Sequence, residues 1–160
     1  MKSTAIFPGS FDPVTLGHVD ILKRSCRLFS EIILLIGNNI TKNTMFSLND
    51  RMEMCREAVA SVKTSCKISV ESFQGLTTDF ARKCGAGAII RGVRTFADFE
   101  YEMQIAAVNR RLNPEVETIF LACGDEFACV SSSAVRELAK FGADLSGYVP
   151  ECVIKKVKNL

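Results

Sequence analysis

Short apolar runs alternate along this chain with longer segments in which apolar residues recur every three or four positions. The run at residues 32–36 (Ile-Ile-Leu-Leu-Ile) is typical of a strand buried on both faces. Alternation of strands with helices predicts right-handed βαβ crossovers, and therefore a parallel sheet with helices on both faces. The expected strands are residues 3–7, 32–36, 67–71, 88–90 and 118–122.

Helical spacing fills the intervals between these strands. Val19, Leu22, Cys26 and Phe29 follow one helical stripe. A chain of 160 residues is long enough for one sizeable core. We therefore predict an α/β fold, a doubly wound parallel sheet of the Rossmann-like kind, in a single domain over residues 1–160. Further helices are expected at residues 52–59, 76–84 and 99–112, after the serines at 131–133, and at about 150–159.

The composition argues against several classes of protein. Twenty lysines and arginines face 18 acidic residues, so the chain lacks the electrostatic footprint of a nucleic-acid-binding protein. No apolar run is long enough to span a membrane, and no signal peptide opens the chain. Seven cysteines without a C-x-x-C pair, together with a single histidine, argue against a structural zinc site and a redox protein. We expect a cytoplasmic protein with reduced thiols, and neither a nucleic acid nor a membrane as its partner.

A loop with two glycines follows the first strand. In doubly wound sheets ligands bind beyond the carboxyl ends of the strands, which places a site from Pro8 onward. Gly9 and Gly17 are expected to let the backbone turn sharply near a ligand, and His18 falls in the first turn of the next helix. A histidine there can donate a hydrogen bond to a phosphate oxygen and stabilise charge that builds in the transition state. The plain alternative is a strand–turn–helix junction with an incidental histidine.

Further phosphate-binding side chains are expected at the same edge of the sheet. Arg91 and Arg94 follow the strand at 88–90, and each guanidinium offers a planar fork of donors to a phosphate. Lys42 comes shortly after the second strand and would act as a mobile point charge. The serines at 131–133 are good helix caps and are also suited to hold an anion. Each of these features has an ordinary structural explanation when it is taken alone.

Taken together, these segments resemble one enzyme family across essentially the whole chain. Residues 15–18 (Thr-Leu-Gly-His) resemble the T/H-x-G-H signature of the nucleotidyltransferase superfamily, and the wider stretch 7–21 resembles phosphopantetheine adenylyltransferase. Residues 98–102 (Asp-Phe-Glu-Tyr-Glu) are similar to a run in that family, and residues 130–133 (Val-Ser-Ser-Ser) to the superfamily's second signature. The resemblance implies a nucleotidyltransferase fold. It also implies transfer of AMP from ATP, in the presence of Mg²⁺, to 4′-phosphopantetheine, which gives dephospho-coenzyme A and pyrophosphate.

The resemblance also implies roles for individual residues. His18 is expected to stabilise the transition state, with Lys42 and Arg91 as further catalytic residues. The acceptor substrate is expected to contact Ser10, Lys42, Thr77 and Arg91. No cluster of carboxylates marks a metal site built by the protein, so Mg²⁺ would be held by phosphates and water, with no ligand from protein side chains. The residues implied for ATP binding are Ser10, Phe11, His18, Gly92, Val93, Arg94, Glu102, Phe127, Ala128, Cys129, Val130, Ser131, Ser132 and Ser133.

Assembly and regulation are carried over from the same resemblance. Members of the family form hexamers and are inhibited by coenzyme A, so a homo-hexamer and feedback inhibition by coenzyme A are expected. Two alternative functions remain open. One is another small-molecule nucleotidyltransferase, such as nicotinate-mononucleotide adenylyltransferase. The other is a non-catalytic nucleotide-binding module, because a fold alone does not establish activity.

Overall fold

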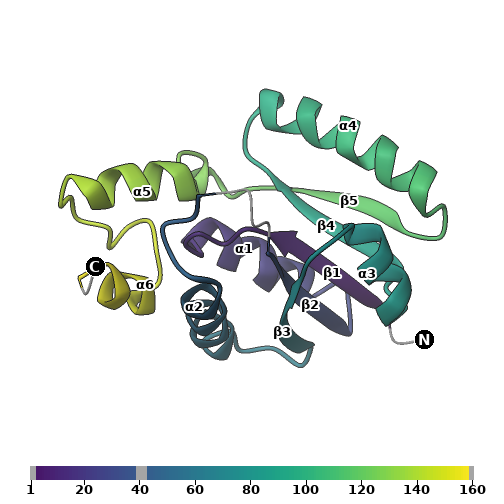
Figure 1. The fold of residues 1–160 in the computed structure, drawn as a ribbon, viewed down its shortest axis with the longest axis horizontal. Helices are drawn as coiled ribbons and strands as arrows, with labels where there is room; N and C mark the ends of the chain where they lie inside the picture. Colours follow the sequence, from purple (N-terminus) through teal and green to yellow (C-terminus); the bar gives the residue numbers. More distant parts are fainter. Residues whose placement is uncertain (1–2, 39–42, 159–160) are drawn as a thin grey trace.

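The computed structural model describes residues 3–38 and 43–158, and at its centre lies a five-stranded parallel sheet (Figure 1). The strand order is β3-β2-β1-β4-β5, so the chain builds outward from β1 on one side and then returns to place β4 on the other. The doubly wound parallel sheet predicted from the sequence is therefore confirmed. The strands are β1 (Thr4–Gly9), β2 (Glu31–Gly37), β3 (Lys67–Phe73), β4 (Ala88–Val93) and β5 (Glu117–Ala122).

The strand order reverses between β1 and β4, and this point determines where a ligand can bind. Ile6 of β1 pairs with Ile89 of β4, and Gly9 at the end of β1 pairs with Ile36 of β2. Because all the strands run parallel, their carboxyl ends lie at one edge, which is where open α/β sheets bind ligands. Strand β4 is longer than expected, so Arg91 lies within the strand and not after it.

Six helices and a short 3₁₀ turn are found in residues 3–38 and 43–158, most of them close to the expected positions. Helix α1 ends at Ser25 with Cys26 as its C-cap, so Phe29, expected on the same stripe, lies beyond the helix. Helix α4 begins three residues earlier than expected, because the Thr95 hydroxyl accepts the N–H of Asp98 and caps it. The elements are α1 (Leu16–Ser25), α2 (Leu48–Ala60), α3 (Thr77–Cys84), α4 (Phe96–Leu112), η1 (Asp125–Phe127), α5 (Ser132–Lys140) and α6 (Glu151–Val157).

The core has one apolar layer on each face of the sheet, because successive side chains of a strand point to opposite faces. On one face, buried side chains such as Leu34 and Ile90 belong to a cluster that includes residues of α1, α2, α5 and α6. On the other face, Ile33 and Ile89 pack with Phe80 of α3. Helices therefore cover both faces, as predicted. Among the helices of the described residues, none is both long enough and apolar enough to cross a membrane.

Helix α4 is largely separate from this core and lies along β5 (Figure 1). Of its 17 residues only Glu102 is buried. Its apolar contact with the sheet includes Phe99, whose ring centroid lies 5.2 Å from that of Phe120 on β5. Phe96, Met103 and Val108 are 83%, 47% and 52% exposed. A single copy of the chain therefore leaves several large apolar side chains of α4 in contact with solvent, which is unusual for a free helix surface.

Candidate active site

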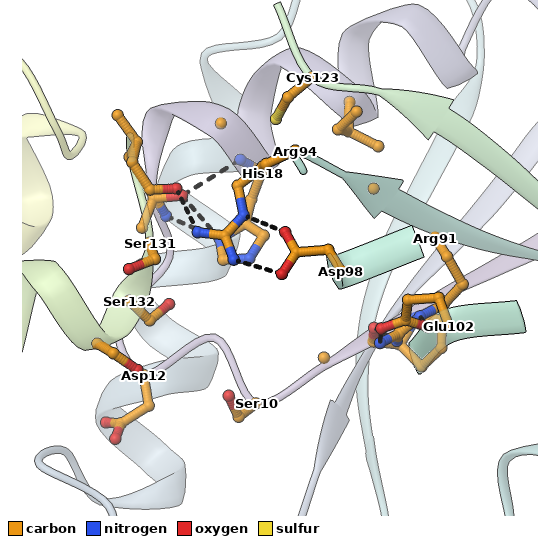
Figure 2. A pocket seen from close by; sticks show the side chains of 18 of the residues that line it. Ser10, Asp12, His18, Arg91, Arg94, Asp98, Glu102, Cys123, Ser131 and Ser132 are labelled. Carbon is orange, nitrogen blue, oxygen red and sulfur yellow. Dashed lines mark hydrogen bonds and ion pairs between the residues drawn. The ribbon is translucent and has the colours of Figure 1, made fainter. Parts of the chain in front are cut away.

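A cleft of about 690 Å³ opens at the carboxyl ends of β1 and β4 (Figure 2). Its wall is formed by the loop after β1 and by residues of α1, β4, α4 and α5. The cleft therefore lies at the point where the strand order reverses, as the rule for doubly wound sheets requires. Side chains that line it include His18, Arg91, Arg94, Asp98, Glu102 and Arg136.

His18 lies in the first turn of α1 and is held there by Thr15. The Thr15 side chain accepts the backbone N–H of His18 at 3.3 Å, and the Thr15 backbone N–H donates to His18 Nδ1 at 3.0 Å. This reciprocal pair forms a capping box, in which a histidine occupies the position more often taken by glutamate or glutamine. A backbone N–H can only donate, so Nδ1 must be the acceptor and the proton of a neutral imidazole must lie on Nε2. The ring therefore offers an Nε2–H donor to a ligand in the cleft.

Two phenylalanines fix the plane of the His18 ring. The centroid of the Phe11 ring lies 4.9 Å from that of His18, and Phe7 packs edge-on to both rings. Phe11 is 1% exposed and has a φ of 45°, a left-handed conformation that is rare outside glycine. The sharp turn expected at Gly9 is thus made by Phe11.

Neither glycine of the loop makes the sharp turn expected of it, although both line the cleft as a place near a ligand requires. A side chain at Gly9 would place its Cβ 2.9 Å from the Phe11 ring, so glycine is needed there for space. The prediction of a sharp turn at Gly17 is also wrong, because this residue lies inside α1 and is not among the residues with positive φ. Gly17 instead forms part of the cleft wall.

The protonation state of His18 follows from its surroundings. Burial, and then the positive charges of Arg94 and Arg91, lower the pKa of His18 to about 4. The free protein therefore holds a neutral imidazole at physiological pH. A neutral ring can donate from Nε2 without adding a charge that the nearby arginines would oppose.

Each arginine of the 91–94 segment is paired with a carboxylate of α4. Arg91 forms a fork with Glu102, with Nε–Oε2 and Nη2–Oε1 distances of 2.7 and 2.5 Å, and also donates to the carbonyl of Pro8. Arg94 forms a similar fork with Asp98 at 3.0 and 3.3 Å. Figure 2 shows both pairs beside the cleft. Paired in this way, the two guanidinium groups are held in place before a ligand binds.

The start of α5 is bonded to the loop after β1, although more than 100 residues separate them in the sequence. Ser131 caps α5 through the N–H of Ala134, and Ser132 donates to the carbonyl of Pro13 at 2.8 Å. Arg136, one turn further on, donates to the carbonyl of Asp12 at 2.6 Å. Ser131 therefore caps the helix, while Ser132 joins its amino end to the loop that precedes His18.

Asp12 is a structural residue that the sequence alone did not single out. Asp12 is 2% exposed, and its carboxylate accepts the backbone N–H groups of Met45 and Phe46, both at 2.9 Å. Asn43 and Thr44, just before this anchor, also line the cleft. Lys42, expected to be catalytic, lies outside the described residues. An Asp-Pro pair in the loop was the only available signal, and it does not reveal a partner 33 residues away.

The structure gathers most of the other expected residues at one place. The residues of the expected set that line the cleft are Ser10, His18, Arg91, Gly92, Arg94, Glu102, Val130, Ser131, Ser132 and Ser133. The other members of the expected set that the structure describes do not line the cleft. They are Phe11, Thr77, Val93, Phe127, Ala128 and Cys129. Phe11 as a whole residue is only 1% exposed, so its contact with ATP is a prediction that the cleft wall does not support. The roles assigned to all these residues remain predictions.

The low pKa of His18 predicts a specific loss of stability in acid. The histidine of the unfolded chain titrates near 6.5 and that of the folded chain near 4, so the unfolded state binds more protons between these values. Stability due to His18 is therefore present above pH 6.5 and is lost as the pH falls toward 4. We expect His18 to contribute about 2 kcal/mol to the loss of unfolding free energy between pH 7.5 and pH 5. Urea unfolding of the unaltered chain and of His18→Asn at both pH values measures this difference, and an equal loss in both proteins would contradict it.

Comparison with known proteins shows the fold and the family of this chain. Residues 6–138 match the Cytidylyltransferase-like family. Among solved structures, the fold is similar to the Plasmodium falciparum nicotinic acid mononucleotide adenylyltransferase complexed with NaAD, with a TM-score of 0.66. That comparison covers 99% of this chain and 96% of the other at 16% identity, so it shows a shared fold alone.

Curated relatives are much more similar in sequence. The chain is 46% identical over 155 residues to the phosphopantetheine adenylyltransferase of Heliobacterium modesticaldum, which covers 97% of this chain and 90% of that protein. It is 47% identical over 150 residues to the protein of the same name from Methylococcus capsulatus, covering 94% and 91% of the two chains. Similarity of this degree over nearly the full length shows that the chain belongs to the phosphopantetheine adenylyltransferase family.

Proposed function

We propose that this chain transfers AMP from ATP to 4′-phosphopantetheine, giving dephospho-coenzyme A and pyrophosphate. The observation that carries the proposal is the arrangement around His18. A single Nε2–H donor, two arginine forks and the serine-rich start of α5 all line one cleft at the switch point of the sheet. These are groups suited to polyphosphate, and the relatives at 46% and 47% identity are named for this reaction.

The proposed chemistry is a direct displacement at phosphorus. An oxygen of the 4′-phosphopantetheine phosphate attacks the α-phosphorus of ATP. The bond from that phosphorus to the oxygen bridging it to the β-phosphate breaks, and pyrophosphate leaves with the electron pair. No side chain becomes covalently attached. Transfers of this kind are catalysed mainly by positioning and by stabilising charge.

Each proposed catalytic group has a part in that displacement. His18 would donate its Nε2 hydrogen to a non-bridging oxygen of the α-phosphate, where negative charge builds. Arg91 would hold the phosphate of the acceptor, and Lys42 would add a mobile positive charge. Glu102 and Asp98 orient the two arginines, so the phosphates meet donors that are already in place.

Mg²⁺ is proposed to accompany the triphosphate. When bound, it would neutralise phosphate charge and favour departure of pyrophosphate. Within residues 3–38 and 43–158, no three His, Cys, Asp or Glu side chains lie together in a way that could hold a metal ion. The residues present therefore fit an ion bound chiefly by phosphate oxygens and water, as is common for Mg²⁺.

We also propose a cytoplasmic enzyme that assembles as a homo-hexamer and is inhibited by coenzyme A. Coenzyme A contains the phosphopantetheine group of the product, so it would occupy the same cleft. The exposed apolar side chains of α4 support assembly, because association of copies would remove them from water.

The proposed transfer of AMP to 4′-phosphopantetheine can be tested directly. The purified chain, incubated with ATP, Mg²⁺ and 4′-phosphopantetheine, should release pyrophosphate much faster than with nicotinate mononucleotide as acceptor. His18→Ala should lower turnover by about 10² to 10³-fold, because it removes a donor to the transition state, while ATP binding should weaken much less.

Lys23→Ala, at an exposed position of the same helix, serves as the matched control and should leave turnover unchanged. No pyrophosphate with either acceptor would refute the catalytic proposal. A faster reaction with nicotinate mononucleotide would replace the proposed substrate, and full activity of His18→Ala would remove His18 from the mechanism.

Assembly of several copies through α4 can be tested by measuring the mass in solution. Light scattering after size-exclusion chromatography should give about six times the chain mass of 17.6 kDa. Val108→Glu should lower that mass, since Val108 lies on α4 and is 52% exposed in the single chain. Phe141→Glu, at an 83% exposed position at the end of α5, should leave the mass unchanged. A monomeric chain, or a mass unaffected by Val108→Glu, would refute assembly through α4.

A further inference from the structure

Arg51 is a buried cation beside the proposed phosphate site. It lies in α2, four residues after the N-cap Ser47, and is only 3% exposed. Its Nη1 donates to the carbonyl of Ser10 at 2.8 Å and to that of Gly37 at 3.1 Å. Its Nε is also buried, and no acceptor for it is found in the part of the chain that the structure describes.

The position of Arg51 is electrostatically unfavourable in two ways. None of the ion pairs found among the described residues includes Arg51. Residues 39–42, which the structure does not describe and which are nearest to Arg51 in the sequence, include no Asp or Glu. Burial of a charge without a counter-charge costs free energy. The residue also lies in the first turns of α2, where the helix dipole disfavours a positive charge.

The two carbonyls bound by Arg51 belong to neighbouring strand ends. Ser10 directly follows β1 and lines the cleft, and Gly37 is the last residue of β2, the strand paired with β1. The guanidinium therefore binds the backbone of Ser10 without being part of the cleft wall, whereas Ser10 itself lines the cleft. A buried positive charge at this place would be compensated when an anion binds in the cleft beside Ser10.

We propose that Arg51 is a positioning residue for the nucleotide phosphates. It holds the Ser10 loop in place and supplies a buried positive charge that the polyphosphate neutralises, without touching the ligand. This inference rests on the proposed function, because it requires a polyphosphate in the cleft. A purely structural role would need only the two hydrogen bonds to carbonyls, which a neutral side chain can provide in part.

Calorimetric binding of inorganic pyrophosphate, ATP and adenosine to four proteins separates the two roles. The proteins are the unaltered chain, Arg51→Gln, Arg51→Lys and Arg56→Gln. Arg51→Gln keeps an amide donor but removes the charge, whereas Arg51→Lys keeps the charge. Arg56→Gln is the matched control, since it removes the same charge from an exposed position on the same helix.

We expect Arg51→Gln to weaken binding of pyrophosphate and ATP by about tenfold or more, and binding of adenosine by less than about twofold. Arg51→Lys should bind pyrophosphate and ATP with affinities within about threefold of those of the unaltered chain, and Arg56→Gln should bind them as the unaltered chain does.

Unchanged phosphate binding by Arg51→Gln, or an equal loss for adenosine, would overturn the proposal. If Arg51→Gln does not fold, a tenfold loss of pyrophosphate binding in a folded Arg51→Lys would overturn the role of the charge. Absence of ATP binding by the unaltered chain would instead refute the proposed function.

Discussion

The hydrogen bond from the Thr15 backbone to His18 Nδ1 determines what the site can do. It is half of a capping box, so the interaction that starts α1 also selects the tautomer of the His18 imidazole. Phe11 and Phe7 then limit the rotation of the ring. Because Nδ1 is occupied by the backbone, the only hydrogen that the neutral ring can offer a phosphate is the one on Nε2. The capping box at the start of α1 therefore also prepares the Nε2–H donor of His18.

The rest of the cleft depends on contacts between segments that are distant in sequence. The parallel sheet brings the ends of β1 and β4 together, and α4 then supplies a carboxylate to each arginine of the 91–94 segment. Arg136 and Ser132 attach α5 to the loop after β1. The positive charges are thus fixed by the protein before phosphate binds, which avoids the cost of ordering them during the reaction.

Periodicity and local motifs were sufficient to predict the sheet, most helices and the edge at which the cleft lies. The strand at 32–36 is fully apolar, and the loop after the first strand carries glycine and histidine at that edge, so both signals are local. The role of Arg51 could not be predicted, because a lone arginine in an amphipathic helix normally lies on the surface and nothing nearby indicates its burial. The anchoring of Asp12 to Met45 and Phe46 was missed for the same reason, since it depends on tertiary contact.

The state of the single imidazole is the central physical claim and can be measured directly. His18 is the only histidine of the chain, so nitrogen-15 NMR of the ring needs no assignment by mutation. The structure predicts a protonated Nε2 and an unprotonated Nδ1 at pH 7, with no titration of the ring near pH 6.5, because the pKa is lowered to about 4. A proton on Nδ1, or a titration midpoint near 6.5, would contradict the account.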